Sequence, residues 1–273
     1  MRQPTLFRTK APLAWFGSDS AVAEQLAGKL SACKHVTIPF CGGMAILPHL
    51  TARAIVANDK HDAAINFYRV ASGVLGEDAR QDLLIRCQHT LSHPSELSTA
   101  QSLVKSGSND SLRAWAFWAM CWIGRKGQGG TSNQGGLPSV RRTAIGGTNA
   151  SRVKSAACDL PCWAEQFERC EWECRDFREV LADVKDRPDC GLYVDAPWVK
   201  AGKGYLHSFA EQDHRDLRDL LAGFSETVIV VRYDDCDLIR ELYADWTIET
   251  AESTSQSGGK VSEVWISAQK KPA

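Results

Sequence analysis

Short apolar runs alternate with amphipathic segments along this chain, and that alternation limits the folds open to it more than any other feature. Residues 35–38, 54–57, 191–194 and 227–231 are apolar runs of strand length. Residues 62–74, which follow the second run, carry apolar side chains at helical spacing. Strands that alternate with helices predict an α/β protein with a mainly parallel sheet covered on both faces.

The other segments extend the same pattern. We expect further helices over residues 44–54, 176–184 and 210–221, a strand over residues 171–174, and two C-terminal strands over residues 246–250 and 261–268. A polar, glycine-containing turn joins the last two strands, which predicts an antiparallel edge to the sheet.

A helical region interrupts the alternation. Residues 77–88, 95–104 and 110–123 have helical character with no strand among them, which predicts an inserted helical lobe. Residues 124–147 then contain eight glycines and almost no large apolar side chain, so we expect a flexible loop.

Composition narrows the class of protein. The 273 residues are 44% hydrophobic and 24% charged, as in soluble globular proteins. No apolar run approaches the roughly 18 residues of a membrane span, and no secretory signal is visible, so we expect a cytoplasmic protein with ten reduced cysteines.

The charge is unevenly distributed. The whole chain has a net charge of -1, yet no acidic residue lies between Asp110 and Asp159. That stretch carries seven basic residues, namely Arg113, Arg125, Lys126, Arg141, Arg142, Arg152 and Lys154. A surface that binds a polyanion is therefore expected here, with a solvated linker as the alternative for the glycine-rich part.

Ligands of parallel α/β sheets bind at the carboxyl ends of the strands. Three turns there carry suggestive residues, each with a structural alternative: the glycine turn of Phe40, Cys41, Gly42 and Gly43 is also a simple tight turn, Asp59 is also a helix cap, and Asp176 with Phe177 is also a cap and a core aromatic.

The fourth turn is the most informative. Asp195, Ala196, Pro197 and Trp198 directly follow a buried strand. The carboxylate and the Ala196 carbonyl, held extended by the proline, can accept both hydrogens of an exocyclic amine while the indole stacks on the base. Accepting those hydrogens localises the nitrogen lone pair, so that the amine can attack an electrophilic methyl group.

These motifs together resemble those of Dam-like DNA adenine-N6 methyltransferases. The ordered set covers about residues 13–245, and it comprises Trp15-Phe16-Gly17, Phe40-Cys41-Gly42-Gly43, Asn58-Asp59, Arg175-Asp176-Phe177, Asp195-Ala196-Pro197-Trp198 and Arg232-Tyr233-Asp234.

The resemblance implies a Rossmann-like class I methyltransferase sheet, S-adenosyl-L-methionine as methyl donor, and double-stranded DNA with a flipped-out adenine as substrate. It implies cofactor contacts from Trp15, Gly17, the turn of residues 40–43, Asp59, Asp176, Phe177 and Asp195. It also implies a catalytic domain of residues 1–75 and 166–273, and a target-recognition lobe of residues 76–165. Neither a membrane nor an obligatory protein partner is implied.

The chain departs from the family pattern at three positions. Asp19 replaces a lysine, Ile38 replaces an acid before the glycine turn, and Ala196 with Trp198 turn D-P-P-Y into D-A-P-W. Three other functions therefore remain open: methylation of cytosine N4, which needs the same two acceptors, a DNA-binding module without turnover, and a dehydrogenase, against which the absence of G-x-G-x-x-G spacing counts.

Three residue clusters have competing interpretations. Trp115, Phe117, Trp118 and Trp122 fit a hydrophobic core better than base stacking. Cys158, Cys162, Cys170 and Cys174 suggest zinc, but the last two are four apart on a predicted strand, roughly 13 Å, which disfavours one shared ion. His207 and His214 are expected at the surface.

Overall fold

The computed structural model describes residues 7–18, 20–106, 110–124, 129–131, 147–200, 206–254 and 260–268. The chain divides into two compact units. One, the helical unit, comprises Met1–Ser20, Gly42–Pro48 and His61–Arg169, and the other, the sheet unit, comprises Ala21–Cys41, His49–Lys60 and Cys170–Ala273.

These units divide the chain differently from the predicted domains of residues 1–75 with 166–273 and 76–165. The first twenty residues, the segment Gly42–Pro48 and the helix α2 (Asp62–Ala71) belong to the helical unit. The reason is packing: α2 buries most of its length, and it packs on α5 (Asp110–Ile123) of the helical unit. Which unit reads DNA stays a prediction.

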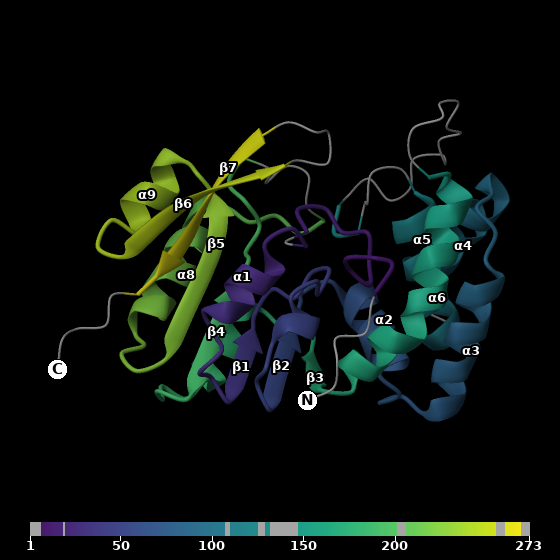
Figure 1. Cartoon of the computed structure of the whole chain (residues 1–273), viewed down its shortest axis with the longest axis horizontal. Coiled ribbons are helices and arrows are strands. Elements are labelled where there is room, and N and C mark those ends of the chain that lie inside the picture. Colours follow the sequence, from purple (N-terminus) through teal and green to yellow (C-terminus); the bar gives the residue numbers. More distant parts are fainter. Residues whose placement is uncertain are drawn as a thin grey trace. The chain divides into compact units, whose positions relative to one another are not determined.

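The sheet unit is built on a seven-stranded sheet of order β3-β2-β1-β4-β5-β7-β6 (Figure 1). Its strands are β1 (His35–Ile38), β2 (Ala54–Asn58), β3 (Cys170–Glu173), β4 (Cys190–Val194), β5 (Val228–Asp234), β6 (Thr247–Thr254) and β7 (Lys260–Ser267). The first five pair in parallel, and β7 pairs antiparallel with both β5 and β6. The predicted α/β fold with an antiparallel edge is confirmed.

Helices cover this sheet because its strands are apolar on both faces. The helices of the unit are α1 (Ala23–Gly28), α7 (Phe177–Asp183), α8 (Glu211–Ala222) and α9 (Asp237–Leu242). Leu181, Leu217 and Ile239, from α7, α8 and α9, share one core with β4 and β5. The segment after α1 approaches Gly191 of β4 so closely that a Cβ there would lie 2.8 Å from the sulfur of Cys33.

The helical unit is organised around α5. Its other helices are α2, α3 (Glu77–His89), α4 (Pro94–Ser106) and α6 (Asn149–Phe167), and all four pack on α5. Trp115, Phe117, Trp118 and Trp122 are buried, so the core interpretation of this cluster is confirmed. Among the described residues, no helix is both long and apolar enough to cross a membrane.

Two expectations for local structure differ from what the chain adopts. Within residues 44–54, Leu47–His49 form a short 3-10 turn and Ala54 already begins β2. Pro48 has no backbone N–H to donate, so it does not support the longer helix that we expected. The helix α6 was not foreseen, since Pro161 lies inside it and interrupts the sequence pattern.

A carboxylate that closes one turn of the sheet unit generates a stability prediction. Asp186 accepts hydrogen bonds from the backbone of Ser225, Glu226 and Thr227 and from two hydroxyls, at 2.8 to 2.9 Å. Some loss of solvation at this exposed carboxylate would raise its pKa, but these donors outweigh that effect and lower the pKa well below its usual range.

We expect Asp186→Ala to lower the free energy of unfolding by about 1–2 kcal/mol at neutral pH, because three backbone donors lose their acceptor. The lowered pKa makes this stabilisation present above the unfolded-state pKa and lost as the pH falls through the folded-state value. Urea unfolding of both proteins at pH 7 and at lower pH measures the effect. The control is Asp219→Ala, because Asp219 is an exposed residue of α8, and this change should leave the free energy of unfolding nearly unchanged. Equal effects of the two substitutions would contradict the prediction.

Candidate active site

The strand order places a topological switch point in the sheet unit between β1 and β4. From β1 the chain proceeds outward through β2 to β3, and it then returns to β4 on the other side of β1. His35 to Thr37 pair with Cys190 to Leu192, so the turns after the two strands leave the same edge side by side. Ligands of open α/β sheets bind at such a point. The predicted turns at Phe40 and at Asp195 are therefore neighbours.

A buried asparagine fixes three of these turns. Asn58, at the end of β2, donates from Nδ2 to the carbonyls of Pro39 (2.9 Å) and Arg175 (3.1 Å), and its Oδ1 accepts from the backbone N–H of Arg175 (2.9 Å). Its own carbonyl accepts from the N–H of Cys41 (2.7 Å). One side chain thus joins the segments that follow β1, β2 and β3, a role that the sequence did not reveal.

Asp59 follows Asn58 and is half-buried at the same edge. It does not cap α2, because the N-cap of that helix is His61, whose Nδ1 accepts from the N–H of Ala64. Burial, and next the charge of Asp59, raises the pKa of the Cys41 thiol well above its usual value. Cys41 is therefore a neutral thiol with a packing role.

Three phenylalanines meet beside the first turn. The ring centroids of Phe40, Phe177 and Phe209 lie 5.3 to 5.7 Å apart in every pairing. Phe177 is buried in the core, as the structural alternative held, whereas Phe40 and Phe209 are half-buried.

The expectation of a surface position for His214 is wrong. This histidine is 2% exposed, its ring packs on Phe209, and its Nδ1 lies 2.9 Å from the hydroxyl of buried Tyr233. Helix α8 turns the side chain inward, and burial lowers the pKa of the imidazole, so His214 stays neutral near pH 7. His207 is exposed, as expected.

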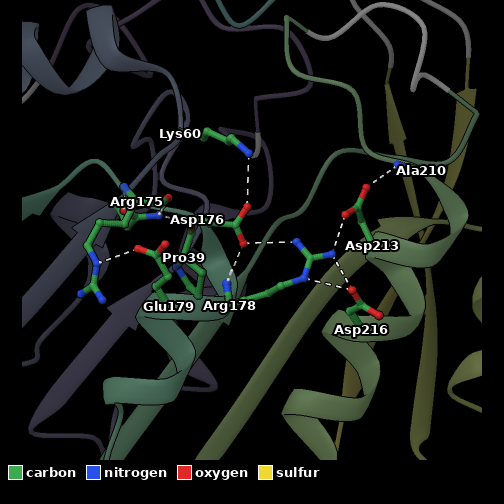
Figure 2. A network of polar contacts seen from close by, with 10 residues as sticks. Pro39, Lys60, Arg175, Asp176, Arg178, Glu179, Ala210, Asp213 and Asp216 are labelled. Atoms are coloured by element: carbon green, nitrogen blue, oxygen red, sulfur yellow. Dashed lines mark hydrogen bonds and ion pairs between the residues drawn. The ribbon is translucent and has the colours of Figure 1, made fainter.

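Asp176 lies at the centre of a charged network (Figure 2). It caps α7 by accepting from the N–H of Arg178 (3.1 Å), and its second oxygen accepts from Lys60 (3.2 Å). The Arg178 guanidinium also binds Asp213 and Asp216 of α8, each at 2.6 Å, and so ties α7 to α8. Partial burial would raise the pKa of Asp176, but these donors outweigh it and lower the pKa, so the carboxylate is ionised and oriented.

The segment after β4 is held from two sides. Asp195 accepts from Arg232 at 3.0 Å and, through its other oxygen, from the indole N–H of Trp198 at 3.3 Å. Further along, the buried carboxylate of Asp234 accepts from the backbone N–H groups of Val199 (2.9 Å) and Lys200 (3.1 Å). Ala196 is buried and Trp198 is half-buried. The acid and the indole therefore stand in a fixed relation at the switch point.

In the helical unit, Trp15 packs among glycines. A Cβ on Gly43 would lie 2.6 Å from the Cβ of Trp15, and one on Gly130 would lie 2.6 Å from its ring. Trp15 also forms a bridge with Gly129, and Tyr68 donates to the carbonyl of Gly42 (2.7 Å).

Most of the segment 124–147, for which we expected a flexible loop, namely residues 125–128 and 132–146, lies outside the described residues. Residues 129–131 are described, and their glycines pack on Trp15. Arg125, Lys126, Arg141 and Arg142 lie outside the described residues, as does Asp19. Arg113 is described, and it is paired with Asp62 and donates to the carbonyl of Val104. This pairing satisfies its charge within the helical unit.

Among the described residues, no three side chains of His, Cys, Asp or Glu are placed to hold a metal ion. Cys158 and Cys162 lie on α6 in the helical unit, whereas Cys170 begins β3 in the sheet unit.

The comparison with protein families agrees with this geometry. The model of the D12 class N6 adenine-specific DNA methyltransferase family matches residues 15–256, which is most of the chain. The chain belongs to this family, and it is therefore an enzyme that methylates adenine N6 in DNA. A comparison of the sequence with curated proteins finds no match. The family decides the base in favour of adenine over cytosine, and methyltransferases of this kind generally take their methyl group from S-adenosylmethionine.

The arrangement around Asn58 generates a prediction for stability. Asn58→Ala should lower the free energy of unfolding by about 2–4 kcal/mol, because buried groups of the two flanking segments lose their partners.

The matched control is Asn66→Ala in the helical unit, since Asn66 is also buried and donates from Nδ2 to the carbonyl of Asp110 at 2.9 Å. We expect it to cost about 1–2 kcal/mol. Urea unfolding of the two variants tests the difference; Asn58→Ala no more destabilising than Asn66→Ala would refute the role of Asn58.

Proposed function

We propose that the enzyme transfers the methyl group of S-adenosylmethionine to N6 of an adenine that is flipped out of double-stranded DNA. The observation that carries the proposal is the group of Asp195, Ala196, Pro197 and Trp198 at the switch point, with Asp195 and Trp198 hydrogen-bonded to each other. A base inside a duplex cannot reach such a group, and so the target nucleotide must leave the stack.

The residues of the sheet unit fit the cofactor. The ionised, partly exposed Asp176 and the half-buried ring of Phe40 suit an adenine, and half-buried Asp59 at the end of β2 suits a ribose diol. S-adenosylmethionine supplies an electrophilic methyl group on a sulfonium. Phe177 is buried, so we assign it the role of packing against the Phe40 ring. Cys41 would contact the cofactor through its backbone.

The proposed cofactor roles of Trp15, Gly17, Gly42 and Gly43 rest on the family resemblance. In the helical unit, Trp15 and Tyr68 hold the two glycines of the turn, and Gly17 has a φ of 76° that favours glycine. These residues shape the backbone that follows Phe40 and Cys41 in the chain.

At the target, the chain's own residues act on the amine. The Asp195 carboxylate and the Ala196 carbonyl accept the two N6 hydrogens, and Trp198 stacks on the base. Acceptance of these hydrogens localises the N6 lone pair, which otherwise conjugates with the ring, so that N6 can attack the methyl group. The new N–C bond forms as the C–S bond breaks, and the proton that N6 then loses passes through Asp195 to solvent.

Asp195→Asn tests the catalytic proposal. The amide keeps the shape of the side chain but loses the charge and one acceptor, so turnover should fall more than tenfold while DNA binding changes within a few-fold. Methyl transfer from labelled S-adenosylmethionine and gel-shift titration measure the two quantities. Asp219→Asn on α8 serves as the control, and turnover of Asp195→Asn above about a tenth of that of the wild type would reject the assignment.

The basic stretch of the helical unit supports a second part of the proposal, that this unit contacts DNA phosphates. Its candidates are Arg125, Lys126, Arg141 and Arg142, whereas paired Arg113 is a weaker candidate. Each lost phosphate contact reduces the slope of log affinity against log salt by about 0.9.

Replacing these four residues by glutamine should therefore reduce that slope by about 3–4 units while binding of S-adenosylmethionine stays unchanged. Fluorescence anisotropy over a range of salt concentrations gives the slope, and calorimetry gives cofactor affinity. The control replaces Lys34, Arg53 and Lys185 of the sheet unit together with Arg69. An unaltered slope in the first variant would make the four charges part of a solvated linker.

A further inference from the structure

A buried arginine joins the candidate catalytic aspartate to a second carboxylate that the motif does not include. Arg232, on β5, is 3% exposed, and its guanidinium binds Asp195 at 3.0 Å through Nη1 and Glu263 of β7 at 2.8 Å through Nη2. Glu263 is fully buried, and its other oxygen accepts from the indole N–H of Trp265 at 2.8 Å. The three charges thus form one line from β7 through β5 to the end of β4.

The sheet register explains how this line arises. Arg232 lies opposite Trp265 in the antiparallel ladder of β5 and β7, and Glu263 lies opposite Asp234. Because side chains two apart on a strand share a face, all four side chains emerge on the same face of the sheet. The antiparallel pairing of β7 with β5 therefore places Glu263 near Arg232, and through Arg232 near the end of β4, a strand of the parallel part of the sheet.

Arg232 also contacts the aromatic member of the motif. Its guanidinium carbon lies 4.8 Å from the centroid of the Trp198 ring. A planar guanidinium both forks between two carboxylates and stacks on an indole, which an ammonium group does not do. One side chain therefore contacts the acceptor and the stacking ring together.

Electrostatics indicate what this contact achieves. Partial burial beside an indole disfavours the ionised form of a carboxyl group, and a cation at hydrogen-bond distance favours it. Burial would lower the pKa of Arg232, but the charges of Asp195, Tyr193 and Glu263 outweigh it and raise the pKa, so the guanidinium stays charged at every accessible pH. The positive charge of Arg232 is thus paired with two negative charges, those of Glu263 and Asp195.

We infer that Arg232 is a positioning residue, which keeps Asp195 ionised and aimed at the target amine and fixes the orientation of Trp198, while Glu263 holds Arg232 in place. This inference rests on the proposed role of Asp195. It assigns a function to a residue of β5 outside the D-A-P-W motif, and it gives the buried Glu263 a reason to be charged.

The test compares Arg232→Gln with the double variant Arg232→Gln/Glu263→Gln. Glutamine keeps hydrogen-bonding capacity without charge, and the second change removes the buried carboxylate that the first one leaves without its cation. The double variant therefore keeps the test decisive if Arg232→Gln alone does not fold. Arg218→Gln is the matched control. Arg218 of α8 is also ion-paired, with Asp245, and also lies over aromatic rings, those of Tyr243 and Trp246, but its partners do not include Asp195 or Trp198.

We expect the folded Arg232 variants to lose at least tenfold in kcat while KM for S-adenosylmethionine and for DNA changes less than threefold. The acid limb of the kcat profile should also move to higher pH, since Asp195 then ionises without its cation. Among the described residues, the other titratable or charged groups that act on this pair or lie beside it are Tyr193 on β4, Tyr233 and Asp234 on β5, and Glu263 on β7. The Glu263→Gln single variant shows how far Glu263 itself moves the limb.

Arg232→Lys adds a geometric control. Lysine keeps the positive charge but cannot bind both carboxylates as the planar guanidinium does, so the acid limb of the kcat profile should stay at its wild-type pH while kcat is only partly retained. Unchanged kcat in the double variant, or a lower kcat with an unmoved acid limb, overturns the inference. If Asp195→Asn retains turnover, the proposed function itself fails. If Asp195→Asn is inactive while the Arg232 variants behave like Arg218→Gln, only the role of Arg232 fails.

Discussion

The pairing of β1 with β4 is the constraint on which the candidate site depends. It reverses the direction in which the sheet grows, and it brings two turns from distant parts of the sequence to one edge. Hydrogen bonds then convert that edge into fixed geometry: Asn58 joins the segments after β1, β2 and β3, and Asp234 holds the segment after β4. The site follows from strand order first and from side-chain chemistry second.

Charge pairing is the second organising feature of the sheet unit. Asp176 is oriented by Lys60 and Arg178, and Asp195 is bound by Arg232 (Figure 2 shows the first of these networks). In both networks a carboxylate that is proposed to meet a ligand is paired with at least one cation. The Asp176 network is partly exposed, whereas the pair of Arg232 and Glu263 is buried. A buried pair adds little net stability, but removal of one partner is costly because the other charge stays buried without its counter-ion.

Much of the fold could be predicted because the strands have a clear apolar signal. The runs at residues 35–38, 54–57 and 191–194 correspond to β1, β2 and β4 with nearly the expected bounds. The helices α3, α4 and α5 also have nearly the bounds that we expected. Helix α6 could not be predicted from pattern because Pro161 interrupts it. Residues 44–54 have the apolar composition of a helix because residues 44–47 are buried, although they are not helical over that length.

The motif residues of the site, Arg232 among them, were visible in the sequence, but the contacts that hold Asp195 and Trp198, and the role of Glu263, were not. Asp195 and Trp198 stand in one tetrapeptide, whereas Arg232 and Glu263 come from strands 37 and 68 positions further on, and only the register of β5 with β7 brings them together. His214 has the helical spacing of the buried Leu217 and Leu221 of α8, and this pattern was the signal that it faces inward toward Tyr233.

The most direct test of the whole account is the identity of the methylated nucleoside. Double-stranded DNA is incubated with the enzyme and isotopically labelled S-adenosylmethionine, digested to nucleosides and analysed by mass spectrometry. The account predicts labelled N6-methyldeoxyadenosine with the wild type and its loss with Asp195→Asn. Labelled N4-methyldeoxycytidine, or no labelled nucleoside from a folded enzyme on DNA of varied sequence, would contradict it.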